Sequence, residues 1–111
     1  MRGSPQKQAE IKKLIHLVTE KYQPEKIILF GSYAYGEPDE DSDVDLLIIK
    51  DTEELPFYRR FTVRKLCQDP HRHIPFQPLV VSAHELAGRL RMNDPFFKEI
   101  VEKGEVCYVA V

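Results

Sequence analysis

Residues 28–48, with the sequence ILFGSYAYGEPDEDSDVDLLI, place a Gly-Ser pair and six carboxylates between two apolar runs. The run at residues 26–30 is short, apolar and β-branched, which predicts a buried strand. Residues 43–49 predict a second strand whose later half is buried on both faces. Between the strands, residues 32–35 predict one helical turn and residues 38–42 a polar loop. The stretch therefore predicts two core strands joined by a turn and an acidic loop.

The flanking sequence predicts a single domain over residues 1–111. A helix starts at Ser4-Pro5 and ends before Pro24. The further elements expected are a helix starting near Pro56, an edge strand at residues 76–81, a short helix opened by a capping box at residues 82–85, a helix from Pro95 to Gly104 and a short strand at residues 106–109. This order predicts an α+β sandwich in which helices cover a small mixed sheet. No function is expected of residues 1–4, which match a vector remnant or a disordered start.

The helix that starts near Pro56 carries both apolar and basic residues. Its core-facing side chains are expected to be Phe57, Phe61, Val63, Leu66 and Cys67. The basic residues Arg59, Arg60, Arg64 and Lys65 are expected to form a solvated face, with contact to a partner or a phosphate as the alternative.

Composition excludes several classes of protein. The net charge of −2 argues against a general nucleic-acid-binding surface. No apolar run approaches the ~20 residues that span a bilayer, so no membrane association is expected. Cys67 and Cys107 form no C-x-x-C pair, which predicts reduced thiols and a cytoplasmic protein.

Asp43-Val44-Asp45 is the first candidate for chemistry. On a strand, residues two apart point to the same face, so the two carboxylates are expected to converge. Neighbouring carboxylates resist joint ionisation unless a cation neutralises them. Mg²⁺ suits this arrangement because it takes one or two carboxylates together with water and substrate phosphate oxygens.

Gly31-Ser32, directly after the first strand, is the second candidate. Glycine permits a sharp turn and lets a ligand approach the backbone, and Ser32 opens the short helical turn. Each signal has an ordinary structural explanation alone: acidic loops are commonly solvated surface, and Gly-Ser is commonly a turn. Their combination at this spacing outlines a nucleoside-triphosphate site.

Gly31-Ser32, ten residues and then Asp43-x-Asp45 form the pattern G-S-x10-D-x-D, which resembles the signature of the DNA polymerase β-like nucleotidyltransferase superfamily. The chain length and the S-D-V-D-L-L-I continuation resemble its minimal nucleotidyltransferase branch. The resemblance implies a polymerase β-like palm fold and transfer of a nucleoside monophosphate, usually AMP from ATP. It further implies that catalytic Asp43 and Asp45 bind up to two Mg²⁺ ions, and that Gly31 and Ser32 hold the triphosphate. Many members of this branch pair with a HEPN-domain protein as toxin and antitoxin, and some add AMP to a tyrosine of that partner.

Two positions depart from the family pattern. The third carboxylate of the superfamily falls on Gln77, whose neutral amide cannot deprotonate an attacking hydroxyl. Asp69 or Glu85 could replace it only through tertiary contact. Tyr35 stands where arginine is common in the family. Its expected role is packing, with stacking on a ligand or modification of its hydroxyl as alternatives.

Two function classes therefore remain. The first is an Mg²⁺-dependent nucleotidyltransferase that acts on a protein or small molecule, expected as the antitoxin-type subunit of a HEPN pair. The alternative, motivated by Gln77, is a catalytically weak or inactive module that neutralises a partner by contact. In either case so short a chain is expected to need a HEPN-domain partner or a second copy to complete its cleft. A nucleic-acid-binding role is disfavoured by the net charge.

Overall fold

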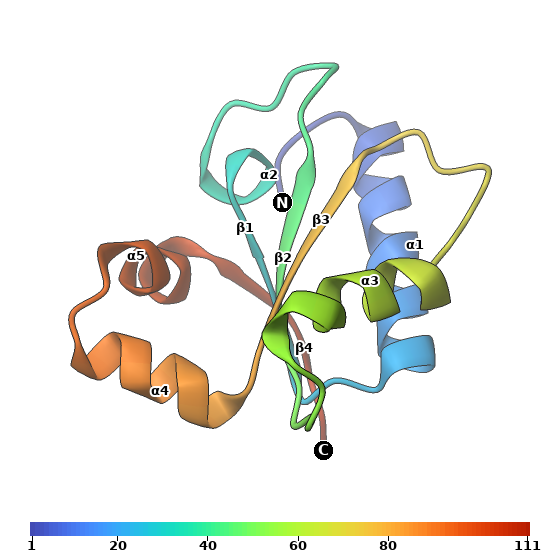
Figure 1. Ribbon diagram of the computed structural model, residues 1–111. Helices are drawn as coiled ribbons and strands as arrows, with labels where there is room; N and C mark the ends of the chain where they lie inside the picture. Colours follow the sequence, from blue (N-terminus) through green and yellow to red (C-terminus); the bar gives the residue numbers. More distant parts are fainter.

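The computed structural model describes residues 1–111 and contains five helices and four strands (Figure 1). Their bounds are α1 Pro5–Tyr22, β1 Lys26–Phe30, α2 Ser32–Tyr35, β2 Val44–Ile49, α3 Pro56–Leu66, β3 Phe76–Val81, α4 Ala83–Arg91, α5 Pro95–Lys103 and β4 Glu105–Val109. The strands form one sheet in the order β3-β2-β1-β4. The β2–β3 pair is parallel, and the β1–β2 and β1–β4 pairs are antiparallel. The predicted mixed sheet and α+β class are confirmed.

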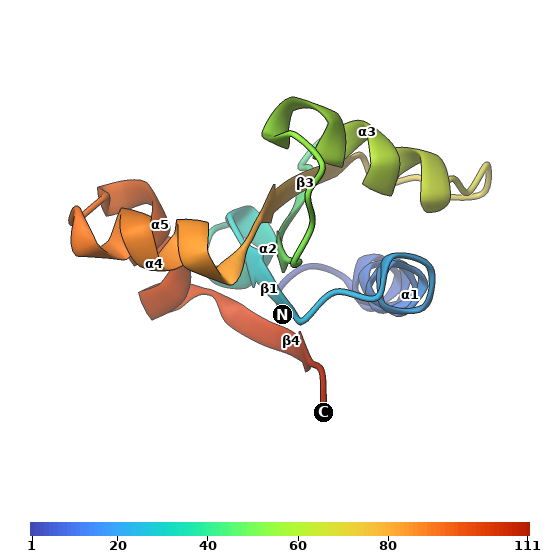
Figure 2. The same ribbon diagram turned by 60° about the horizontal axis from the view of Figure 1, so that its bottom comes forward.

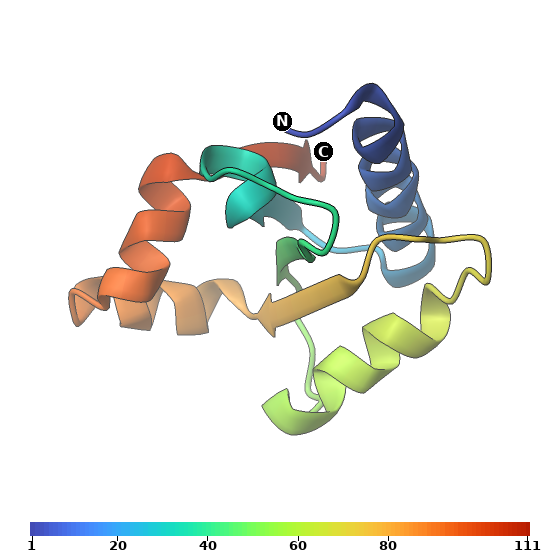
Figure 3. The same ribbon diagram turned by 90° about the horizontal axis from the view of Figure 1, so that it is seen from above.

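Helices cover both faces of the sheet (Figure 3). Helices α1 and α3 lie over one face, and α4 and α5 lie over the other. Because side chains alternate along a strand, Leu46 and Ile48 of β2 join the α1/α3 core, whereas Leu47 and Ile49 join the core beneath α5. All four are buried, as the sequence predicted for a strand covered on both sides.

The predicted starts of α1 and α4 are confirmed by their caps. The Ser4 hydroxyl accepts a hydrogen bond from the Lys7 N–H, with proline in the first turn of α1. Ser82 and Glu85 form a complete capping box at the start of α4. None of the helices combines the length and the hydropathy that crossing a membrane requires.

The predicted core face of α3 is wrong in part. Phe57, Phe61 and Leu66 are exposed, while Val63 is fully buried and so is Cys67 at the end of the helix. Arg59 is also buried, at 6% exposure, which contradicts its assignment to a solvated basic face. Positions 59, 63 and 67 are four residues apart and form one stripe, and that stripe is the one turned inward.

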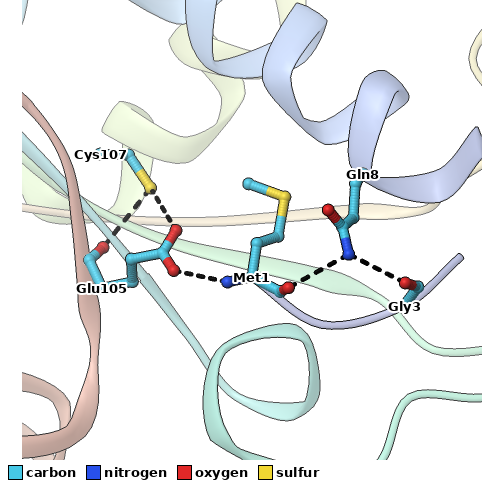
Figure 4. Close-up of polar contacts among 5 residues, drawn as sticks. All are labelled: Met1, Gly3, Gln8, Glu105 and Cys107. Carbon is cyan, nitrogen blue, oxygen red and sulfur yellow. Dashed lines mark hydrogen bonds and ion pairs between the residues drawn. The ribbon is translucent and has the colours of Figure 1, made fainter. Parts of the chain in front are cut away.

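The start of the chain is fixed between β4 and α2. The Met1 ammonium group lies 2.6 Å from Glu105 Oε1, and Gln8 Nε2 donates to the backbone carbonyls of Met1 and Gly3 (Figure 4). Arg2 donates from its N–H to Tyr33 O and from its guanidinium to Gly36 O, both at 2.7 Å. Strand β4 closes the sheet on the edge opposite β3 (Figure 2). The two contacts of Arg2 hold the short helix α2 in place.

Candidate active site

The Gly31-Ser32 turn directly follows β1. Gly31 has φ of +76°, a region that favours glycine, and its carbonyl accepts hydrogen bonds from the N–H groups of Ala34 and Tyr35, each at 3.1 Å. A Cβ at position 31 would overlap Asp45 Oδ2, so the turn lies directly against this carboxylate. The Ser32 hydroxyl makes no hydrogen bond within the protein. Of the four N–H groups of α2, those of Ala34 and Tyr35 are taken up by Gly31 O, which leaves only those of Ser32 and Tyr33 without a backbone acceptor.

Asp43 and Asp45 lie at the start of β2, next to this turn. Asp45 pairs with Phe30 of β1 on one side and with Gln77 of β3 on the other. Neither aspartate forms an ion pair with a basic side chain. Burial, and secondly the negative charge of Asp43, raise the pKa of Asp45 from 3.8 to about 6. The two carboxylates are therefore close enough to repel each other, and no basic side chain pairs with either.

The remaining acids of the opening stretch belong to a self-contained loop. Asp39 Oδ1 accepts hydrogen bonds from the Asp41 N–H at 2.9 Å and from the Ser42 hydroxyl at 3.2 Å. The side chains of Asp39, Glu40 and Asp41 are exposed. This part of the acidic stretch is solvated surface, as its composition indicated.

The position of the expected third acid lies beside Asp45, because the parallel register pairs Asp45 with Gln77. Arg64 of α3 donates from Nη2 to Gln77 Oε1 at 2.9 Å and to Phe76 O at 3.3 Å. Sequence reasoning missed this contact and placed Arg64 on a basic outer strip. The only indication of this contact in the sequence was Gln77 itself, a neutral residue at the position of an acid.

Neither proposed substitute reaches the site. Glu85 accepts hydrogen bonds from Arg59 Nη1 at 2.6 Å and from the Ser82 N–H at 2.7 Å. Asp69 accepts from the His71 N–H at 2.9 Å and lies 3.7 Å from Lys13 Nζ. Tyr35 is half-buried at the end of α2, and no hydrogen bond is formed by its hydroxyl within the chain.

The donor set at Asp43 and Asp45 fits a hard divalent cation such as Mg²⁺. The adjacent carboxylates have no basic partner, and the proton affinity of Asp45 is raised, so a cation would relieve their repulsion. No group of three or more histidine, cysteine, aspartate or glutamate side chains is placed to hold a metal. The other ligands would have to be water and substrate phosphate oxygens, which Mg²⁺ accepts readily.

Comparison with known proteins bears on the family. The model of a family described as a nucleotidyltransferase domain matches residues 11–104. A protein of Methanocaldococcus jannaschii named "Putative protein adenylyltransferase" is 31% identical over 100 residues, covering 88% of this chain and 94% of the relative. Another protein of that name and organism is 49% identical over 47 residues, covering 42% of this chain and 44% of the relative.

A solved structure from Sulfolobus solfataricus, described as a "putative nucleotidyltransferase", has a TM-score of 0.55 and 19% identity to this chain. The match covers 97% of this chain and 90% of the solved chain, and at this identity it supports the fold alone. The family match spans most of the chain, and one relative is covered almost completely. This protein therefore belongs to the nucleotidyltransferase domain family and is a nucleotidyltransferase enzyme.

Proposed function

We propose that this enzyme transfers AMP from ATP to a protein acceptor in an Mg²⁺-dependent reaction. The observation that carries the proposal is the contact of Asp45 with the Gly31 turn, which brings two carboxylates without basic partners against the backbone turn that the proposal assigns to the triphosphate. Relatives of this chain named as protein adenylyltransferases support the donor and the acceptor class.

In this reaction an acceptor oxygen forms a bond to the α-phosphorus of ATP, and the bond from that phosphorus to the pyrophosphate oxygen breaks. Pyrophosphate leaves, and the proton of the acceptor passes to solvent. A divalent cation, when bound, neutralises charge on the triphosphate and the leaving group. Gly31 and Ser32 orient the triphosphate with backbone N–H groups and a hydroxyl, while Asp43 and Asp45 supply the negative charge that retains the cation.

The chemistry at position 77 restricts the acceptor. Gln77 cannot take a proton from the acceptor. Glu85 and Asp69, the two acids considered as replacements, bind Arg59 and the His71 N–H instead. An acceptor that loses its proton easily is therefore favoured. Among protein hydroxyls this is tyrosine, whose pKa is about 10.

The acceptor or regulatory partner is proposed to bind on α3. Phe57, Tyr58 and Phe61 are each more than half exposed and contact one another edge to face, at ring-centroid distances of 5.3 and 5.6 Å. Arg60 and Lys65 on the same helix are exposed and form no ion pair. Two copies joined through this face would bring like charges together, so a different protein with an acidic and apolar surface fits better than a symmetric homodimer. A HEPN-domain toxin is the proposed partner, with this chain as its antitoxin.

The test uses labelled ATP, Mg²⁺ and the product of the neighbouring gene, which the proposal expects to be a HEPN-domain protein. We expect label on the partner with the natural protein and none with Asp43→Asn/Asp45→Asn. A matched control, Asp39→Asn/Asp41→Asn, removes the same charge from the solvated loop and should retain the labelling. If the natural protein transfers no label with Mg²⁺ or Mn²⁺, the transfer proposal is wrong.

A second candidate, a binding module that neutralises its partner by contact, is favoured by Gln77 alone. It predicts that Asp43→Asn/Asp45→Asn still binds and still neutralises the partner. Loss of neutralisation with binding retained would contradict the binding-module candidate and support transfer.

A further inference from the structure

The contact between Arg64 and Gln77 crosses the edge of the sheet. Gln77, Leu79 and Val81 of β3 point toward the α4/α5 face, because Leu79 and Val81 pack into the core on that side. Arg64 belongs to α3, on the opposite face, and reaches around β3 to donate to Gln77 Oε1 at 2.9 Å. Edge strand β3 has no neighbour beyond it, so nothing obstructs this path.

The guanidinium of Arg64 is held in place by the backbone as well as by Gln77. The same Nη2 atom donates to Phe76 O at 3.3 Å, and Arg64 forms no ion pair with any acid. An uncompensated positive charge therefore lies next to the position where the superfamily signature places an acid.

This contact removes Gln77 from the candidate metal site. Oε1 is the only atom of the glutamine side chain that can ligate a hard cation, and one of its two lone pairs already accepts a hydrogen bond from Arg64. A divalent ion on the other lone pair would lie roughly 4–5 Å from the donating guanidinium nitrogen, and the two positive charges would repel each other.

We propose that Arg64 is a positioning residue that holds Gln77 away from the metal site, so that Asp43 and Asp45 are the only protein ligands. The inference rests on the proposed function only in taking those two aspartates as the metal site. It also predicts the outcome of restoring the third acid. In Gln77→Asp the new carboxylate is one methylene shorter than the glutamine side chain, and we expect Arg64 to pair with it, so the substitution alone should not create a third ligand.

The test measures Mn²⁺ binding without nucleotide, by the loss of the free-ion electron paramagnetic resonance signal. Four proteins form a double-mutant cycle: the natural chain, Gln77→Asp, Arg64→Gln, and the double variant Gln77→Asp/Arg64→Gln. Arg60→Gln is the matched control, since Arg60 is an exposed arginine of the same helix. Thermal unfolding of each protein establishes that it is folded before binding is compared.

We expect Gln77→Asp to raise Mn²⁺ affinity by less than about threefold, because Arg64 pairs with the new carboxylate. The double variant should raise Mn²⁺ affinity by about tenfold or more, because its third carboxylate has no cationic partner. Arg60→Gln combined with Gln77→Asp should behave like Gln77→Asp alone. The proposal is overturned if Gln77→Asp alone binds as tightly as the double variant, or if the double variant gains nothing. The Mn²⁺ measurement contains no nucleotide, so it is independent of the transfer assay. Absence of AMP transfer would not contradict the Arg64 proposal, and absence of the expected Mn²⁺ pattern would not contradict AMP transfer.

Discussion

Asp45→Asn is predicted to stabilise the metal-free protein at neutral pH. The folded chain keeps Asp45 half-buried beside Asp43, and this raises the pKa of Asp45 from 3.8 to about 6. The folded state therefore holds this proton more tightly than the unfolded state. Stability falls as pH rises from about 4 to about 6, and the loss is fully present above that window.

A shift of roughly two pKa units corresponds to about 3 kcal/mol, and the partial solvent exposure of Asp45 reduces this to about 1.5 kcal/mol. For a chain of this size that is a rise in Tm of about 5 °C. Asparagine has nearly the same shape as aspartate, so removal of the charge is the main change.

The measurement is thermal unfolding in EDTA at a series of pH values between 4 and 8, followed by repetition with Mg²⁺. The gain of Asp45→Asn should vanish near pH 4 and reach its full size above pH 6. Asp43→Asn should give a smaller gain, because burial is the larger cause of the raised pKa and Asp43 the smaller one. Mg²⁺ should stabilise the natural protein more than the variant.

Asp41→Asn is the matched control, since Asp41 is exposed in the loop and its substitution should change stability by less than about 0.5 kcal/mol. An Asp45→Asn protein that is less stable than the natural one at pH 7, or whose gain does not depend on pH, would refute the reasoning.

Three further outcomes are expected. Gly31→Ala should cost about 1–3 kcal/mol in urea unfolding and weaken Mn²⁺ binding, because its φ is positive and the new Cβ overlaps Asp45; unchanged stability and Mn²⁺ affinity would contradict this. Arg59→Leu should lower the free energy of unfolding by about 1–3 kcal/mol in the same assay, since it removes a buried guanidinium from the Glu85 carboxylate and the Glu54 carbonyl. A variant as stable as the natural chain would contradict this. Phe57→Ser/Phe61→Ser should leave Tm within about 2 °C, because both rings are exposed, and should weaken binding of the partner measured by calorimetry; an unchanged affinity would exclude this face as the docking surface.

The candidate site was predictable from the sequence in its local parts. Gly31-Ser32 and Asp43-x-Asp45 are recognisable because a turn and a strand are encoded by neighbouring residues. The opposition of Gln77 to Asp45 followed from the resemblance, and the parallel register has the two residues paired. The Arg64 contact was not predictable, since it joins a helix on one side of the sheet to a β3 residue, 13 positions later, that points to the other side.

The sequence by itself determined the order of the elements, the helix starts, the positions of the strands to within a residue, and the strand covered on both faces. These features depend on groups within a few residues of one another, such as the Ser82 hydroxyl and the N–H three positions later. Only the tertiary structure decided which side of α3 faces inward. That helix has apolar residues around much of its circumference, so its rotation depends on distant partners such as Glu85, 26 residues beyond Arg59. Periodicity along a helix cannot encode the position of a partner that arrives from another element, and here that partner decided which arginines reach the interior and the candidate site.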